Sequence, residues 1–135
     1  VMGTSTAGIA HAAISAHILG KPMGYVRGSS KSHGRNNRIE GKLEKGDKVV
    51  VVEDLISTGG SSIEVVEALR EAGAEVLAVI SIFTYETAKA DKNFQDANVK
   101  KLSLCTISEL IDTAVAENYV TSEEGKGIIE WLREI

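Results

Sequence analysis

Apolar side chains recur along this chain at two different spacings, which predict both helices and strands. Between Gly8 and Leu19 they return every three or four residues, the period of a helix, and Gly20-Lys21-Pro22 ends that pattern. Lys48 is instead followed by four consecutive valines, typical of a central strand buried on both faces of a parallel sheet. The two patterns together predict an α/β protein.

Other short apolar runs predict further strands, at residues 1–4, 23–27, 75–83 and 99–104. The chain between the valine run and residue 75 is long enough for a crossover helix that joins two parallel strands. The polar stretch at 87–98 is assigned to no helix or strand. We therefore expect a single domain in which helices flank a mainly parallel sheet.

A Ser or Thr followed three residues later by Glu forms a capping box, which marks the start of a helix. The pattern occurs at Ser61, Thr106 and Thr121. It predicts a helix that starts at Ser61 and closes at Gly73, and two others near 107–117 and 122–133. In the last of these, Trp131 is interpreted as core, or as part of a dimer surface.

Composition and charge narrow the classes of function. The 135 residues are 43% hydrophobic, enough for one core, and include no apolar run of about 18 residues that would span a membrane. The net charge of -4 argues against bulk nucleic-acid binding, although residues 21–48 contain eight Lys or Arg and three acids. A local basic stretch favours a small polyanionic ligand over a long phosphate backbone. We expect a cytoplasmic protein that binds neither membranes nor nucleic acid.

The single cysteine, Cys105, and the three histidines do not cluster at the spacing of metal ligands. Cys105 is interpreted as a buried apolar side chain. No side chain is therefore assigned as a metal ligand.

The most informative segment is residues 49–62, Val-Val-Val-Val-Glu-Asp-Leu-Ile-Ser-Thr-Gly-Gly-Ser-Ser. Ligands of open α/β sheets bind beyond the carboxyl ends of the strands, where the two acids and the small-residue turn are expected. The turn presents backbone N–H groups at the start of a helix, its glycines allow close approach, and its hydroxyls add donors. These features predict a phosphate site.

Glu53 and Asp54 would repel that phosphate, so we expect them to contact another part of the ligand, such as sugar hydroxyls. A phosphate beside a vicinal diol indicates a ribose phosphate. The alternative is an ordinary βα turn in which two acids simply end a strand. Paired acids directly after four β-branched residues are, however, a poor way to end a strand for stability alone.

This segment resembles the phosphoribosyl-diphosphate motif of type I phosphoribosyltransferases. Three further stretches resemble the orotate phosphoribosyltransferases of that family, at residues 3–12, 25–34 and 37–41. The resemblance implies the type I phosphoribosyltransferase fold with a flexible catalytic loop. Because Val1 is not an initiator, we expect residues 1–135 to be the core domain, without an N-terminal segment and the base-binding hood elements.

The resemblance also implies a role for each matched position. Glu53 and Asp54 would hold the ribose 2- and 3-hydroxyls, and Asp54 is a candidate catalytic residue. The loop around the 5-phosphate would consist of Ser57, Thr58, Gly59, Gly60 and Ser61. The pyrophosphate-binding loop would consist of Thr4, Ser5, Thr6 and Ala7.

Residues 28–38 include no apolar side chain and are predicted to form a long, mobile loop, disordered without ligand. Arg27, Lys31 and His33 resemble the cations of the family's catalytic loop, which closes over the neighbouring subunit's site in an obligatory homodimer. Lys31 and His33 would stabilise negative charge on the leaving diphosphate while the closed loop excludes water. The alternative for both is a solvated loop, and Arg38 is interpreted as surface charge.

Two positions depart from the family pattern. Gly28 stands where some members have a further cation. Residues 82–86 lack an arginine that some members use for the orotate carboxylate. The contacts to the base therefore stay open.

The resemblance implies magnesium-dependent transfer of the 5-phosphoribosyl group from 5-phosphoribosyl 1-diphosphate to orotate. The products would be pyrophosphate and orotidine 5-monophosphate, in pyrimidine (UMP) biosynthesis. Mg²⁺ would bind mainly through the donor's oxygens. One alternative is a purine or uracil phosphoribosyltransferase, whose loop would not be expected to combine Arg27 with Lys31 and His33. Another is a non-catalytic regulator that senses the donor, which the acidic charge outside residues 21–48 disfavours.

Overall fold

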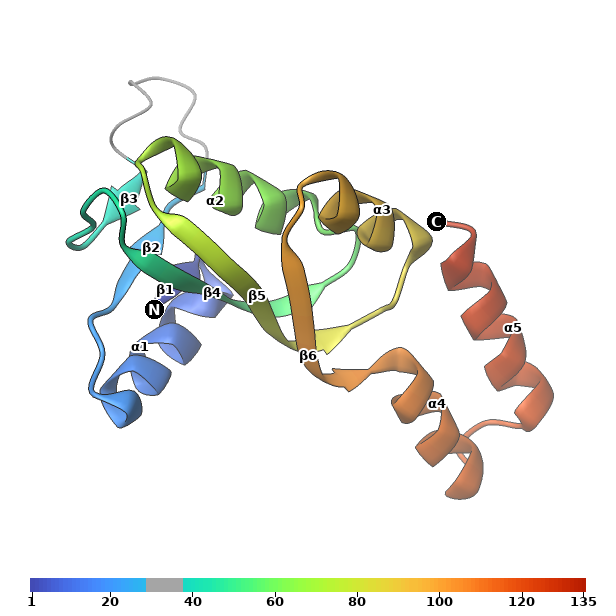
Figure 1. Cartoon of the computed structure of the whole chain (residues 1–135). Coiled ribbons are helices and arrows are strands. Elements are labelled where there is room, and N and C mark those ends of the chain that lie inside the picture. Colours follow the sequence, from blue (N-terminus) through green and yellow to red (C-terminus); the bar gives the residue numbers. More distant parts are fainter. Residues whose placement is uncertain (29–37) are drawn as a thin grey trace.

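The computed structural model describes residues 1–28 and 38–135, and its strands form one sheet in the order β3-β2-β1-β4-β5-β6 (Figure 1). The strands are β1 (Met2–Thr4), β2 (Gly24–Val26), β3 (Ile39–Glu40), β4 (Lys48–Ile56), β5 (Glu75–Thr84) and β6 (Lys100–Thr106). Neighbouring strands are parallel, except that β3 pairs antiparallel with β2 at one edge. The predicted α/β fold and mainly parallel sheet are confirmed.

Helices cover the two faces of the sheet unequally (Figure 1). The helices are α1 (Ala7–Leu19), α2 (Gly60–Glu71), α3 (Ala88–Asp96), α4 (Ile107–Ala116) and α5 (Ser122–Arg133). Helix α1 lies on one face and α2 and α3 lie on the other, whereas α4 and α5 form a hairpin that extends beyond β6. No helix among the described residues is long and apolar enough to cross a membrane.

The order of the strands defines a switch point between β1 and β4. From β1 the chain winds outward through α1 to β2, and from β4 it winds the other way through α2 and α3 to β6. Ligands of open α/β sheets bind outside the carboxyl ends of the strands at such a reversal. The fold therefore places the ends of β1 and β4 where a site is expected.

The core lies between the sheet and the helices α2 and α3. Val51 of β4 is fully buried there against a cluster that includes Val66 and Leu69 of α2. Along β4 the buried residues alternate, because Val50 and Val52 face the other side and are half-buried. The prediction that this strand is buried on both faces is therefore wrong, since α1 leaves part of the second face open.

Two predicted boundaries near the informative segment are also wrong. Strand β4 does not end before the two acids but continues to Ile56, because its pairing with β5 extends through Glu53 and Leu55. Helix α2 begins at Gly60, without the side-chain cap predicted from Ser61. Its N-cap is Gly59, whose φ of 82° lies in the left-handed region that glycine adopts at little cost.

Helix α3 lies within the polar stretch at 87–98, for which the sequence predicts no helix or strand. Thr87 caps it by accepting a hydrogen bond from the Ala90 N–H at 3.1 Å. Its buried side chains are Ala90 and Phe94, four residues apart. So narrow an apolar face in a nine-residue helix gives little periodic signal.

The other two capping predictions are confirmed as helix starts. Thr121 and Glu124 form the complete reciprocal box, whereas Thr106 accepts one hydrogen bond from Glu109. The interpretation of Trp131 as core is wrong, because its side chain is 61% exposed on a helix that extends beyond the sheet. Cys105 is half-buried rather than buried, because β6 is an edge strand.

Candidate functional site

A cavity of about 260 Å³ opens at the switch point between β1 and β4. It is lined by Thr4 at the end of β1 and residues 5–7 after it, by residues 26–28 at the end of β2, and by Arg38 before β3. Strand β4 and helix α2 complete the lining with Glu53, Asp54, Leu55, Ser61, Glu64 and Val65. The cavity thus brings together the predicted pyrophosphate loop, the acid pair and the first turn of α2, which are far apart in the sequence.

The Glu53 carboxylate connects three elements beneath this cavity. Its Oε1 accepts a hydrogen bond of 2.6 Å from the Thr4 hydroxyl at the end of β1. Its Oε2 accepts one of 2.9 Å from the Ser62 hydroxyl in α2. The carboxylate therefore fixes the end of β1 relative to the start of α2.

Burial is the main influence on the ionisation of this carboxyl group. Glu53 is 6% exposed, and the loss of water raises its pKa above the ordinary value. The hydroxyls of Thr4 and Ser62 act in the opposite direction, because they donate to the charged form. Ser62 was missed by sequence reasoning, since nothing in its position indicates that it turns inward toward Glu53.

The loop after β1 is fitted closely against β4. A Cβ at Gly8 would lie 2.5 Å from both the Thr4 Oγ1 and the Val52 carbonyl oxygen, so a glycine lets the first turn of α1 pack against both strands. The Ser5 N–H donates to the Val26 carbonyl at 3.2 Å, and the Ser5–Thr6 peptide is cis. Ser5, Thr6 and Ala7 are exposed at the N-terminus of α1, where backbone N–H groups and the helix dipole favour an anion.

The predicted 5-phosphate loop lies between β4 and α2. Ser61 lines the cavity. Ser57, Thr58 and Gly59 form the turn before α2, and Gly60 is the first residue of that helix. This turn stands at the N-terminus of α2, a second position with positive dipole potential. Two helix N-termini therefore lie at the carboxyl ends of adjacent strands, and each favours an anion.

Arg38 joins Arg27 at the cavity, although sequence reasoning interpreted it as surface charge. Its Nε donates to the Arg27 carbonyl at 3.3 Å, its Nη2 lies 3.9 Å from the Glu64 carboxylate, and its side chain is 24% exposed. The Arg27 Nε is 3.2 Å from the Glu40 carboxylate. The two arginines come together because they directly follow β2 and precede β3, which pair with each other. Because the pairing of β2 with β3 was not predicted, no local pattern indicated that Arg38 would lie at the cavity.

Lys31 and His33 lie outside the described residues. The same holds for most of the predicted mobile loop at 28–38.

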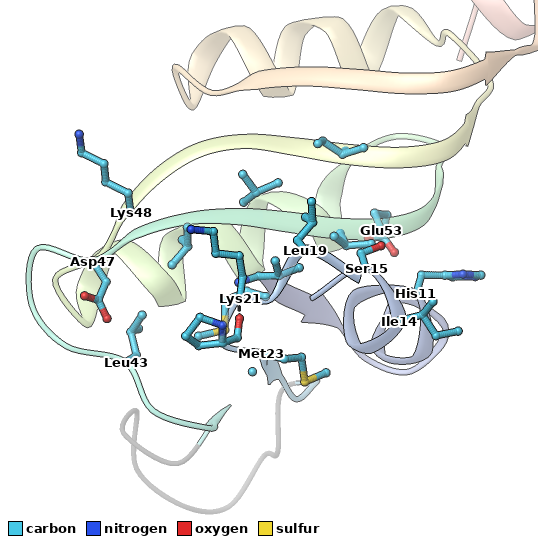
Figure 2. Close-up of a pocket in the computed structure, with 18 of the residues that line it drawn as sticks. His11, Ile14, Ser15, Leu19, Lys21, Met23, Leu43, Asp47, Lys48 and Glu53 are labelled. Carbon is cyan, nitrogen blue, oxygen red and sulfur yellow. Dashed lines mark hydrogen bonds between the residues drawn. The ribbon is translucent and has the colours of Figure 1, made fainter. Parts of the chain in front are cut away.

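A second, larger cavity of about 760 Å³ lies between α1 and the face of the sheet that α1 covers in part (Figure 2). Ile14 and Leu19 line it from α1, and Val50, Ile80 and Leu104 line it from the sheet. Glu53 stands at one end and Asp47 and Lys48 at the other (Figure 2). Its largely apolar walls are unsuited to phosphate, so the smaller cavity is the better candidate site.

Comparisons with known proteins find relatives over most of this chain. Residues 1–118 match the family described as the phosphoribosyl transferase domain. Over 131 residues the chain is 53% identical to an orotate phosphoribosyltransferase of Staphylococcus saprophyticus, which covers 97% of this chain and 64% of the relative. The chain thus spans less than two thirds of that relative's length.

Solved structures show the same likeness. A crystal structure of orotate phosphoribosyltransferase from Aeropyrum pernix is 32% identical with a TM-score of 0.74, covering 83% of this chain and 62% of that one. Mycobacterium tuberculosis orotate phosphoribosyltransferase in complex with 5-phospho-alpha-D-ribosyl 1-diphosphate is 25% identical with a TM-score of 0.65. That match covers 81% of this chain and 63% of the other.

Proposed function

Because this chain belongs to the phosphoribosyl transferase domain family, we propose that its protein transfers a 5-phosphoribosyl group to orotate. The donor is 5-phosphoribosyl 1-diphosphate, and the products are orotidine 5-monophosphate and pyrophosphate. The reaction is a step of pyrimidine biosynthesis.

The observation that supports this proposal is the meeting of residues 4–7 with the acid pair and Ser61 in one cavity. The donor has a diphosphate, a diol and a 5-phosphate along one small molecule. The cavity is lined by the first residues of two helices and by the carboxylates of Glu53 and Asp54. Helix N-termini suit the phosphate groups of such a donor, and carboxylates suit its diol.

In this proposal Glu53 and Asp54 accept hydrogen bonds from the ribose hydroxyls. Residues 57–61 bind the 5-phosphate, and residues 4–7 bind the pyrophosphate. As the bond between C1 and the diphosphate oxygen breaks, N1 of orotate bonds to C1 and gives up its proton to solvent or to the leaving group. Negative charge grows on the departing pyrophosphate. Arg27, with Lys31 and His33, stabilises that charge.

The oxygen atoms that line the cavity are suitable ligands for Mg²⁺. Asp54 supplies a half-buried carboxylate and Thr6 a hydroxyl, and the donor's own phosphate and sugar oxygens would supply further ligands. When bound, the ion would neutralise part of the diphosphate charge. Asp54 is the residue proposed to face it.

The proposal also covers the domain and its assembly. We propose that residues 1–135 form the core domain and that contacts to the base come from parts of the protein that this chain does not include. A homodimer, in which the catalytic loop closes over the neighbouring subunit's site, and a cytoplasmic location complete the proposal.

The test is orotate consumption by the full-length protein with the donor and Mg²⁺. Uracil, adenine and hypoxanthine serve as alternative bases. Lys31→Ala is expected to lower kcat by roughly a hundredfold, because it removes a cation that stabilises the leaving group. The matched control is Lys42→Ala, whose side chain is 85% exposed and outside the smaller cavity, and it should keep kcat within about twofold.

Two results without orotate consumption would each indicate a different function. Consumption of uracil or a purine in place of orotate would assign a sibling transferase. Binding of the donor without consumption of any base would assign the sensing regulator.

A further inference from the structure

Helix α3 and its N-cap residue contact the predicted 5-phosphate turn through two side chains. The Thr87 hydroxyl donates to the Ser57 carbonyl at 2.7 Å. The Asn93 Nδ2 donates to the Thr58 carbonyl at 2.8 Å. Two consecutive carbonyl groups of the turn are thus bonded to side chains at the beginning and near the end of one short helix.

The third residue of the turn also contacts α3. A Cβ at Gly59 would lie 2.7 Å from the Cε2 of Phe94, so the backbone of the turn lies directly against this ring. Phe94 is 2% exposed and belongs to the core cluster. The turn therefore rests on a side chain that has little freedom to move.

These contacts determine where the N–H groups of the turn point. In a trans peptide the C=O and N–H bonds point in opposite directions. With the Ser57 and Thr58 carbonyls bonded to α3, the N–H groups of Thr58 and Gly59 are directed away from α3. That orientation leaves two backbone donors available to an anion at the N-terminus of α2.

A separate contact keeps α3 in register with α2. At the opposite end of α2, the Arg70 guanidinium donates to the carbonyls of Ala97 and Asn98 at 2.6 and 3.0 Å. The two helices are thus joined at both ends, once through the turn and once through Arg70. Displacement of α3 relative to the turn would break both sets of contacts.

We propose that Asn93 and Thr87 are positioning residues for the 5-phosphate site, which they preorganise by fixing the Ser57 and Thr58 peptide groups. This inference rests on the proposed function, because it takes residues 57–61 to bind the 5-phosphate. Preorganised donors bind an anion more tightly than donors that must first be ordered. Neither side chain needs to touch the ligand.

The experiment compares two amides on the same helix in the full-length protein. Asn93→Ala removes the donor to Thr58, whereas Gln95→Ala removes an exposed amide on α3. Calorimetric binding of ribose 5-phosphate and of inorganic pyrophosphate probes the two ends of the cavity separately. Asn93→Ala should weaken ribose 5-phosphate roughly three- to tenfold, the worth of one hydrogen bond, and leave pyrophosphate within about twofold. Gln95→Ala should change neither.

Asn93→Leu separates loss of the donor from loss of side-chain volume. It has a similar branched shape, no N–H to donate and no charge, so it should also weaken ribose 5-phosphate selectively. It also serves as the test protein if the alanine variant does not fold. Equal weakening of both ligands, or of neither, would overturn the positioning role while leaving the proposed function intact. A wild-type protein that binds neither ribose 5-phosphate nor the donor would overturn both.

Discussion

At the scale of single residues, Gly8 decides how closely α1 approaches the two strands beside the cavity. The side chain that it lacks would lie 2.5 Å from the Thr4 Oγ1, the atom that also donates to Glu53. Nonbonded atoms do not approach so closely without displacement of one or both. A glycine here is thus required by packing rather than by backbone conformation.

We therefore expect Gly8→Ala to destabilise the protein by about 1–3 kcal/mol, because α1 or Thr4 must shift. The measurement is the free energy of unfolding in urea. Gly127→Ala is the control, since Gly127 lies in α5 and an added methyl group would meet no described atom within 4 Å.

The control should change stability in the opposite direction. Alanine favours a helix over glycine by up to about 1 kcal/mol where space allows. Gly127→Ala is therefore expected to stabilise the protein. Similar effects of the two variants would contradict the packing explanation for Gly8.

At the scale of secondary-structure elements, Asp91 joins α3, β6 and α5. Its carboxylate lies 2.7 Å from the Lys101 Nζ and 3.1 Å from the Arg133 Nη1. The hydrogen bond from Lys101 is the main influence that holds the Asp91 pKa below its ordinary value, with Arg133 adding to it against partial burial. Arg133 also donates to the Glu86 carbonyl, which fastens the end of α5 to the loop before α3.

The direction of that pKa shift predicts how the contact depends on pH. A lowered pKa in the folded state stabilises the protein above the ordinary value of 3.8, and the stabilisation is lost as the pH falls through the folded-state pKa. Asp91→Asn should lower the free energy of unfolding at pH 7 by about 0.5–1 kcal/mol, since the ion pairs are partly exposed.

The difference between Asp91→Asn and wild type should shrink toward zero in acid, where the carboxyl group is protonated in both folded and unfolded wild type. Urea titrations at pH 7 and in acid, at one ionic strength, would measure it. Asp96→Asn is the control, because Asp96 pairs with the exposed Lys92 within a single helix. A loss for Asp91→Asn that did not vary with pH would refute the ionic explanation.

At the scale of the whole molecule, one face of the sheet is incompletely covered. Leu104 is 77% exposed and Ile82 is 40% exposed, and both line the larger cavity beside α1. Parallel sheets are normally covered on both faces, and exposed apolar grooves of this kind bind apolar molecules. The 135-residue chain is therefore expected to bind a fluorescent apolar dye.

Leu104→Ser should reduce dye fluorescence, because it makes one wall of the groove polar. It should alter the free energy of unfolding by no more than about 0.5 kcal/mol, since the side chain is already exposed. Ile18→Ser is the matched control, because Ile18 is also 77% exposed but lies outside the cavity lining. An equal reduction by both variants would show that the dye does not occupy the groove.

The sequence by itself determined the alternation of strands and helices, because β-branched runs and helical spacing are local properties of the chain. It also identified the acid pair and the small-residue turn, because they follow one another within residues 49–62. Helix α3 was not predictable in this way, since most of its nine residues are polar.

Only the tertiary structure decided which residues support those groups. Ser62 bonds to Glu53, Arg38 lies at the cavity, and Asn93 holds the turn at Thr58. Each of these contacts joins different elements, so it depends on how helices and strands are placed against one another and leaves no periodic signal in the sequence. The acid pair and the turn are thus local in sequence, whereas their positions are fixed by packing between distant segments.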